Sequence, residues 1–241
     1  MSRPANAPIL SVIMPAYNEE GGVSDAVRAV QEHVFSVVPN AELVAVNDGS
    51  RDRTGAILDD LAANDPRVRA VHKQNGGHGP ALITGLAAAR GEYLFLIDSD
   101  NQIPLESFAP LWQHVQNGHD AAFGVRRVRN DARLRRVLTR VIRAALAVLF
   151  GVRLRDANIP FKVFRRQLWN DAAPLIPADT LAPSLFFAVH AARRGARIAF
   201  VDVGHRDRTT GAVSIRRWKL IKFCARAWRQ LLAFRSALRS K

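Results

Sequence analysis

The first hundred residues alternate short apolar runs with segments of helical spacing, and this alternation restricts the chain to few folds. The apolar runs have the length of buried strands and cover residues 9–14, 42–46, 68–72 and 93–97. The helical segments lie between them, at 24–34, 52–63 and 80–89. Strands that alternate with helices need crossover connections, so their sheet is mainly parallel. The sequence therefore predicts an α/β fold in which helices flank a mainly parallel sheet.

Polar residues come after the apolar runs, at the edge where an open α/β sheet collects ligands. The most informative group, Asp98-Ser99-Asp100-Asn101-Gln102, comes after the fourth run. Two carboxylates two residues apart can converge on one hard cation, and oxygen ligands suit Mg²⁺ or Mn²⁺, which also bind substrate phosphates. A solvated turn explains this group equally well when it stands alone. Its weight therefore depends on the residues at the ends of the other three runs.

Three further motifs occupy the corresponding positions after the first, second and third runs. They are Pro15-Ala16-Tyr17-Asn18-Glu19-Glu20, Asn47-Asp48-Gly49-Ser50 and Asn75-Gly76-Gly77-His78-Gly79. The four motifs together resemble the family 2 glycosyltransferases of the GT-A fold, above all the polyprenyl-phosphate sugar transferases of the dolichol-phosphate mannose synthase type. The resemblance is strong over residues 9–130 and looser beyond. It implies a Rossmann-like sheet and a nucleotide sugar donor.

The resemblance assigns donor-binding roles to the first two motifs. It implies that Pro15, Ala16, Tyr17 and Glu19 line the base and ribose, and that Asp48 hydrogen-bonds the edge of the base. The residue types leave two structural alternatives open. Tyr17 also suits a core aromatic position, and Asp48 also suits a turn or a helix cap.

The resemblance also gives the carboxylates of the fourth motif a metal-binding role. Asp98 and Asp100 would hold the donor diphosphate through Mg²⁺ or Mn²⁺, with Gln102 as a further ligand and Asp100 as a catalytic residue. The metal would neutralise the departing nucleoside diphosphate, which is Lewis-acid catalysis. For His78 we favour a loop position over a catalytic one.

The charge of the chain is divided unevenly between its halves. Residues 1–120 hold 8 Lys and Arg against 15 Asp and Glu, a net charge of −7, whereas residues 121–241 hold 27 against 6, a net charge of +21. A basic half of this kind indicates a polyanionic partner, namely nucleic acid, an anionic membrane surface or a phosphorylated substrate. A well-solvated arginine-rich surface is the alternative.

A lipid phosphate acceptor would account for the basic half. Its oxygen is already an anion near pH 7, so the reaction needs cations to hold two anionic substrates together rather than a strong base. By resemblance, Arg126 and Arg208 are catalytic. Arg126 binds the acceptor phosphate, and Arg208 and Ser214 contact that phosphate or the diphosphate. Asp156 contacts the sugar, orients an arginine or is purely structural. The expected reaction is a metal-assisted, inverting transfer from GDP-mannose or a UDP-hexose to a polyprenyl phosphate.

Two other functions compete with this one. A family 2 enzyme that glycosylates a saccharide or another lipid hydroxyl would need a catalytic base, and no unambiguous one is visible. A basic nucleic-acid-binding module would explain the positive half but not the Asp98 and Asp100 pair, and no helix-turn-helix or ribonucleoprotein motif is evident. We therefore expect no nucleic-acid partner.

The chain divides into a flexible N-terminus at 1–8, a GT-A domain at 9–205 and a basic acceptor or membrane segment at 206–241. Residues 215–238 predict a basic amphipathic helix, with Lys219, Lys222, Arg226 and Arg229 on one stripe and Trp218 and Trp228 on the apolar arc. This helix either lies in an anionic membrane surface or packs on the domain. No apolar run reaches the roughly 18 residues of a membrane span, and the lone Cys224 fits a reducing compartment. We expect a peripheral protein on the cytoplasmic face of a membrane, with a membrane-protein partner left open.

Overall fold

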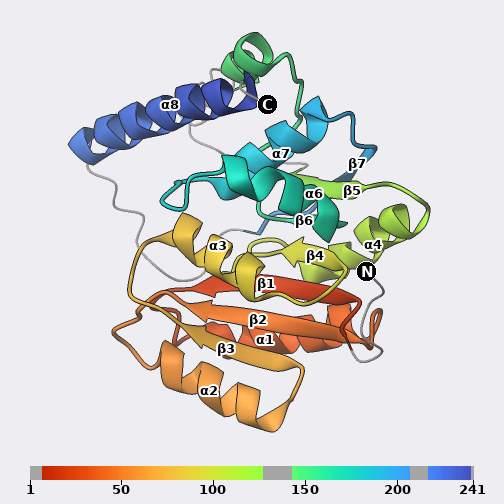
Figure 1. Cartoon of the computed structure of the whole chain (residues 1–241). Helices are drawn as coiled ribbons and strands as arrows, with labels where there is room; N and C mark the ends of the chain where they lie inside the picture. The colour runs from red at the N-terminus through yellow and green to blue at the C-terminus, as the bar shows by residue number, and fades with distance from the viewer. Residues whose placement is uncertain (1–6, 127–142, 207–216, 240–241) are drawn as a thin grey trace.

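The computed structural model describes residues 7–126, 143–206 and 217–239, and Figure 1 shows them around one central sheet. The sheet has seven strands in the order β3-β2-β1-β4-β6-β5-β7. They are β1 (Leu10–Ala16), β2 (Ala41–Asn47), β3 (Val68–His72), β4 (Tyr93–Leu96), β5 (Ala121–Arg126), β6 (Lys162–Arg165) and β7 (Ile198–Val203). All neighbouring pairs are parallel except the two that involve β6. The predicted α/β class with a mainly parallel sheet is therefore confirmed.

Helices cover both faces of this sheet. They are α1 (Val23–Val30), α2 (Thr54–Asn64), α3 (His78–Ala88), α4 (Phe108–Gln116), α6 (Arg166–Ala172), α7 (Pro183–Arg193) and α8 (Arg217–Arg239). Residues of α1, α2 and α4 share one buried cluster with β1 and β2, whereas α3, α6, α7 and α8 contribute to a second cluster. A short π-helix, Gln31–Phe35, extends α1, and two 3₁₀ turns, Leu105–Ser107 and Ala173–Leu175, precede α4 and follow α6.

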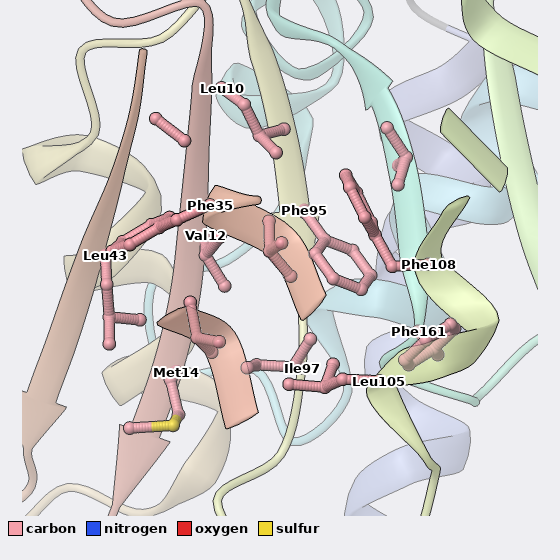
Figure 2. Close-up of a cluster of buried hydrophobic side chains, with 14 of the residues drawn as sticks. Leu10, Val12, Met14, Phe35, Leu43, Phe95, Ile97, Leu105, Phe108 and Phe161 are labelled. Carbon is pink, nitrogen blue, oxygen red and sulfur yellow. The ribbon is translucent and has the colours of Figure 1, made fainter. Parts of the chain in front are cut away.

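Burial follows the apolar patterns of the sequence. In α1 the buried residues Val23, Ala26, Val27 and Val30 have the i, i+3, i+4, i+7 spacing of one helical face. Every residue of β1 and β2 is buried, as expected for central strands of a sheet covered on both faces. Figure 2 shows the first cluster, in which the Phe95 ring lies 4.9 Å from Phe108 and from Phe161. The contact with Phe161 joins the β4 strand to the second half of the chain.

Strand β6 was not predicted. Its four residues are too few to show a period, and it begins with Lys162, a residue type that rarely occupies a core. The strand forms because β4 and β5 present free edges on its two sides, and it pairs antiparallel with both. This insertion places the segment before β6 at the same edge of the sheet as the ends of β1, β2 and β4.

The predicted C-terminal helix corresponds to α8, and its described side chains divide between two environments. Leu231 and Phe234 are buried, and Phe234 lies 4.9 Å from Phe186 of α7. Trp228 and Leu232 remain 46% and 42% exposed. The helix therefore packs on the sheet's helical layer along one side and leaves apolar groups on its surface. Within the described residues, no helix is both long and apolar enough to span a bilayer. The domain boundary at residue 206 remains a prediction.

Candidate active site

A cleft of about 610 Å³ opens at the carboxyl ends of β1, β2 and β4. The loop before α3, the start of that helix and two segments of the second half, 158–160 and 181–184, also line it. Eight residues predicted from the sequence meet there, namely Pro15, Ala16, Tyr17, Glu19, Asp48, Asp98, Asp100 and Arg126. Tyr17 is 43% exposed, so the core-aromatic alternative does not hold. The strand ends thus bring together motifs that are up to 111 residues apart in sequence.

Hydrogen bonds between two loops fix the β1 side of the cleft. The Asn18 amide donates to Ser50 Oγ at 3.0 Å, and Asn18 Oδ1 accepts from the Arg51 amide at 2.8 Å. The Glu19 amide donates to Thr54 Oγ1 at 2.8 Å, in the first turn of α2. Asn18 has a φ of 52°, a left-handed conformation that asparagine tolerates better than most residues. This turn sets the direction in which Tyr17 and Glu19 enter the cleft.

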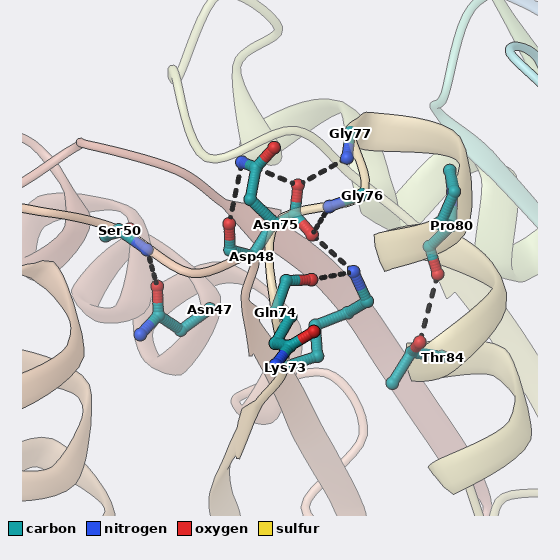
Figure 3. Close-up of polar contacts among 10 residues, drawn as sticks. All are labelled: Asn47, Asp48, Ser50, Lys73, Gln74, Asn75, Gly76, Gly77, Pro80 and Thr84. Carbon is teal, nitrogen blue, oxygen red and sulfur yellow. Dashed lines mark hydrogen bonds and ion pairs between the residues drawn. The ribbon is translucent and has the colours of Figure 1, made fainter.

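Directly after β2, the Asp48 carboxylate is enclosed by the loop that precedes α3 (Figure 3). It accepts hydrogen bonds from Lys73, Asn75, Gly76 and Gly77, all of them in that loop. The side chain is only 4% exposed. Neither the turn nor the helix cap considered for Asp48 describes this arrangement. Its expected contact with the base remains a prediction.

The carboxylates of Asp98 and Asp100 have a different environment. Within the described residues, Asp98 makes no hydrogen bond, and its ion-pair contact is His78 Nε2 at 3.8 Å. Asp100 Oδ1 accepts from the Gln102 amide at 3.2 Å. Burial raises the pKa of Asp98 to about 6, and Asp100 adds to this, whereas His78, Arg126 and Lys162 oppose it. The charged form of Asp98 is therefore only weakly stabilised by its neighbours.

The carboxylates of Asp98 and Asp100 suit a divalent cation whose remaining ligands come from a substrate. Among the described residues, no group of three or more His, Cys, Asp and Glu side chains is placed to hold a metal alone. Mg²⁺, however, commonly uses one or two carboxylates and takes its other ligands from phosphates and water. Asp98 and Asp100 supply such a pair. Gln102 lines a smaller hollow of about 40 Å³ that adjoins these aspartates, so its ligand role remains a prediction.

Arg126, at the end of β5, is held by Asp156 in a bidentate ion pair. Its Nε and Nη2 atoms donate to the two carboxylate oxygens at 2.9 and 3.0 Å. The fixed fork geometry of a guanidinium makes such a pair directional. Among the roles considered for Asp156, these bonds agree with orienting an arginine. Arg126 also lines a separate hollow of about 490 Å³, together with Arg143, Arg153 and Arg155.

Lys162 lies fully buried behind this pair. Its Nζ donates to the carbonyls of Ala157 and Ile159 and, at 2.6 Å, to Ser184 Oγ, which lines the cleft. The pKa of Lys162 is lowered to about 7, mainly by burial and in smaller part by Arg126, against the opposing charges of Asp156 and Asp98. Sequence reasoning assigned no role to Lys162 or Ser184. A lysine between Phe161 and Val163 in an apolar segment was the available signal.

The first turn of α3 touches the opposite wall of the cleft. A Cβ atom at Gly79 would lie 1.8 Å from the Thr180 carbonyl oxygen, so only glycine permits this approach. The 179–181 segment is in turn held by α8. Gln230 Oε1 accepts from the Leu181 amide at 3.1 Å, and Arg226 donates to Asp179 Oδ2 at 2.8 Å.

Two residues expected at the acceptor, Arg208 and Ser214, lie outside the described residues. Their roles remain predictions.

Comparisons with known proteins agree with this geometry. The family described as Glycosyl transferase family 2 matches residues 11–176, well over half of the chain. The chain belongs to glycosyltransferase family 2. An undecaprenyl-phosphate 4-deoxy-4-formamido-L-arabinose transferase from Shewanella sediminis is 28% identical over 215 residues, which are 88% of this chain and 63% of that protein. One from Pseudomonas aeruginosa is 27% identical over 213 residues, 87% of this chain and 61% of that protein. The chain thus spans less than two thirds of the length of these relatives.

Solved structures share the fold of this family 2 chain. Glucosyl-3-phosphoglycerate synthase from Mycobacterium tuberculosis in complex with UDP has a TM-score of 0.68 at 23% identity, covering 95% of this chain and 80% of that one. The same enzyme with Mn²⁺, UDP-glucose and phosphoglyceric acid has a TM-score of 0.69 at 22% identity, with the same coverage. At this identity the likeness shows the fold alone, which is the GT-A fold expected from the sequence.

Proposed function

We propose that this chain transfers a sugar from a nucleotide diphosphate sugar to a polyprenyl phosphate. The observation that carries the proposal is the position of Arg126. This arginine lines both the cleft with the carboxylate pair and the hollow with three further arginines. The two spaces therefore share one wall, where a cation can contact both a donor diphosphate and an acceptor phosphate. The curated relatives named above are undecaprenyl-phosphate transferases, which supports this acceptor class.

The cleft is the proposed donor site. Tyr17 presents an exposed ring on which a nucleotide base, uracil or guanine, can stack. Asp98 and Asp100 would hold a divalent cation, which would supply Lewis-acid neutralisation of the departing diphosphate. Complexes of the M. tuberculosis synthase that contain Mn²⁺ and UDP support this assignment.

The arginine hollow is the proposed acceptor site. Arg143, Arg153 and Arg155 face it beside Arg126, and Asp202 lies 3.7 Å from Arg155 as a partial counter-charge. The acceptor phosphate oxygen would attack the anomeric carbon as the bond to the diphosphate oxygen breaks. The diphosphate leaves with the electron pair, and the single displacement inverts the anomeric configuration. Arg126, fixed by Asp156, would contact the phosphates of both substrates and offset their repulsion.

Peripheral membrane association through α8 is the remaining part of the proposal. The exposed Trp228 and Leu232 and the basic residues of this helix are the groups that an interfacial helix uses. Changing Lys219, Lys222 and Arg229 to Glu together should release the chain from anionic vesicles in sedimentation. Each basic residue near such a surface contributes about 1 kcal/mol to binding. The difference in binding between the wild type and the variant should therefore be largest at low salt, where charges are least screened. Arg226 is left unchanged because it bonds Asp179.

The reaction itself can be tested with the purified full chain. We would combine radiolabelled UDP-glucose or GDP-mannose, Mn²⁺ and undecaprenyl phosphate in vesicles, and measure label that becomes extractable with lipid. Arg153→Gln and Arg155→Gln should lower kcat/KM for the acceptor by about ten- to hundredfold and leave the donor KM nearly unchanged. Arg197→Gln is the matched control, since this exposed arginine pairs with Asp120 and does not line the hollow. Transfer to phosphoglyceric acid but not to the lipid would contradict the proposed acceptor.

A further inference from the structure

A buried lysine joins two segments that line the cleft from the second half of the chain. Lys162, the first residue of β6, is fully buried. Its Nζ donates to the carbonyl of Ala157 at 3.1 Å, to the carbonyl of Ile159, and to Ser184 Oγ at 2.6 Å. These three acceptors match the three hydrogens of an ammonium group. The lysine therefore ties the loop before β6 to the first turn of α7.

These bonds fix which groups the two segments present to the cleft. Ala157 and Ile159 are buried, whereas Asn158 between them is exposed and lines the cleft. The Ser184 hydroxyl donates to the Ile159 carbonyl at 3.2 Å and accepts from Lys162. A hydroxyl oxygen has two lone pairs, so Ser184 can accept one further hydrogen bond from a ligand. Asn158 and Ser184 thus offer polar atoms from positions that Lys162 sets.

The same segment borders the place where the sugar of a bound donor has to lie. Pro160 lines both the cleft and the smaller hollow beside the carboxylate pair, which Arg126 also lines. A diphosphate held at that pair and an acceptor phosphate held at Arg126 require the anomeric carbon to lie between them. The segment 157–160 directly follows Asp156, which fixes Arg126. It therefore flanks the space that is left for the sugar.

We propose that Lys162 is a positioning residue that holds the 157–160 segment and Ser184 as one wall of the sugar site, and that Asn158 on this wall discriminates between donor sugars. The inference deepens the proposed function and rests on it, since it takes the cleft as the donor site. Sugar hydroxyls are both donors and acceptors, so polar atoms at fixed positions distinguish epimers. A site built to bond one hydroxyl rejects a sugar that lacks it there, because its own polar groups stay unpaired.

The way the lysine is held suits this role. A charge taken out of water is unfavourable unless it is hydrogen-bonded, and here every ammonium hydrogen has an acceptor. The Phe123 ring lies 5.2 Å from Nζ and adds a cation–π contact. Two of the three acceptors are backbone carbonyls, so the lysine holds the main chain of the loop. An apolar residue at position 162 would release that main chain and with it the direction of Asn158.

Donor binding tests the wall through pairs of sugars that differ at one carbon. We would measure Kd with Mn²⁺ by calorimetry for UDP, UDP-glucose and UDP-galactose, and for GDP, GDP-mannose and GDP-glucose. Asn158→Ala should change the Kd ratio of an epimer pair by about three- to tenfold, the value of one hydrogen bond, and leave Kd for UDP and GDP unchanged. Asn170→Ala is the matched control, since this exposed asparagine of α6 does not line the cleft. An unchanged epimer ratio in Asn158→Ala would overturn the specificity role.

The same ratio separates a positioning role of Lys162 from a purely structural one. Lys162→Met should shift it in the same direction as Asn158→Ala, and Ser184→Ala, which removes one of the three bonds, should shift it less. The double variant of Lys162 and Asn158 should shift it no further than the larger single effect, because both act through one side chain. A purely structural loss would weaken the nucleotide and its sugars equally and leave the ratio unchanged, which would overturn the positioning role. Should Lys162→Met not fold, Ser184→Ala decides.

Transfer to lipid distinguishes a failure of this inference from a failure of the proposed function. A ratio that responds in the variants, with no label transferred to undecaprenyl phosphate by the wild type, would contradict the acceptor and support the wall. Normal transfer with an unresponsive ratio would overturn the wall and support the proposed function. Absence of any nucleotide binding by the wild type would overturn both.

Discussion

Two aspartates at equivalent places in the sheet have opposite surroundings. Asp48 follows β2 and Asp98 follows β4, and these strands flank β1 on either side. The Asp48 wall, made of Asp48 and the 73–77 loop, satisfies its carboxylate with four donors. The Asp98 wall, made of Asp98 and Asp100, leaves Asp98 without a hydrogen bond among the described residues and with a raised pKa. The Asp48 carboxylate thus has hydrogen-bond donors within the protein, whereas the Asp98 carboxylate has none among the described residues.

The largest expected effect lies at the Asp98 wall. Asp98→Asn and Asp100→Asn should each lower kcat by about a hundred- to thousandfold, because the donor diphosphate loses the charge that binds its cation. The free energy of unfolding should stay the same or rise in Asp98→Asn, since a neutral amide replaces a poorly solvated charge. Chelator should abolish wild-type transfer, and Mn²⁺ should restore it. Full activity in chelator would contradict the metal role of both residues.

The Asp48 wall should respond in the opposite way. Asp48→Ala should lower the free energy of unfolding by about 2–4 kcal/mol, because Lys73 and two peptide amides lose a buried charged acceptor. Asp59, an exposed aspartate that pairs with His72, offers a control. Asp59→Ala should change the free energy of unfolding by less than about 1 kcal/mol. Urea unfolding followed by circular dichroism gives both values. Equal stability of the two variants would remove the distinction between the walls.

The pH dependence of the free energy of unfolding tests the pKa of the buried Lys162. The pKa of Lys162 falls from 10.5 to about 7 on folding. Between these values the unfolded chain binds the proton more strongly, so folding gains stability as pH rises from about 7 toward 10.5. Below pH 7 the penalty of the buried charge is fully present. We expect the unfolding free energy of the wild type, relative to Lys162→Met, to be flat below pH 7 and to rise above it. Parallel pH curves would show that Lys162 keeps an ordinary pKa.

The smallest expected effect concerns the 179–181 segment, which belongs to the second half of the chain. Gln230→Ala removes hydrogen bonds to the 179–181 segment and should lower stability by about 1 kcal/mol. Donor KM should rise by a few-fold, since residues 181–184 line the cleft. Arg229→Ala, one residue away on an exposed position, should leave donor KM unchanged. Equal effects of the two variants would show that the hydrogen bonds of Gln230 do not position the 179–181 segment.

Much of the donor side could be predicted from the sequence. Apolar runs located the parallel strands, and the polar residues at their ends are necessarily neighbours, so Tyr17, Asp48, Asp98 and Asp100 were predicted to meet. The four hydrogen-bond donors around Asp48 could not be predicted. Two of its four donors are backbone amides, which carry no residue signature, and Lys73 lies 25 residues away. The same holds for Lys162, whose partners are carbonyls and one serine.

The close approach at Gly79 has a mechanical consequence. The peptide plane at Thr180 lies where a methyl group on residue 79 would be, so the start of α3 and the 179–181 segment cannot slide past each other freely. Gln230 and Arg226 tie that segment to α8, and the 73–77 loop ties the start of α3 to Asp48. A displacement of α8, for example on docking against a lipid surface, would therefore also displace the 179–181 segment and the start of α3, both of which border the cleft.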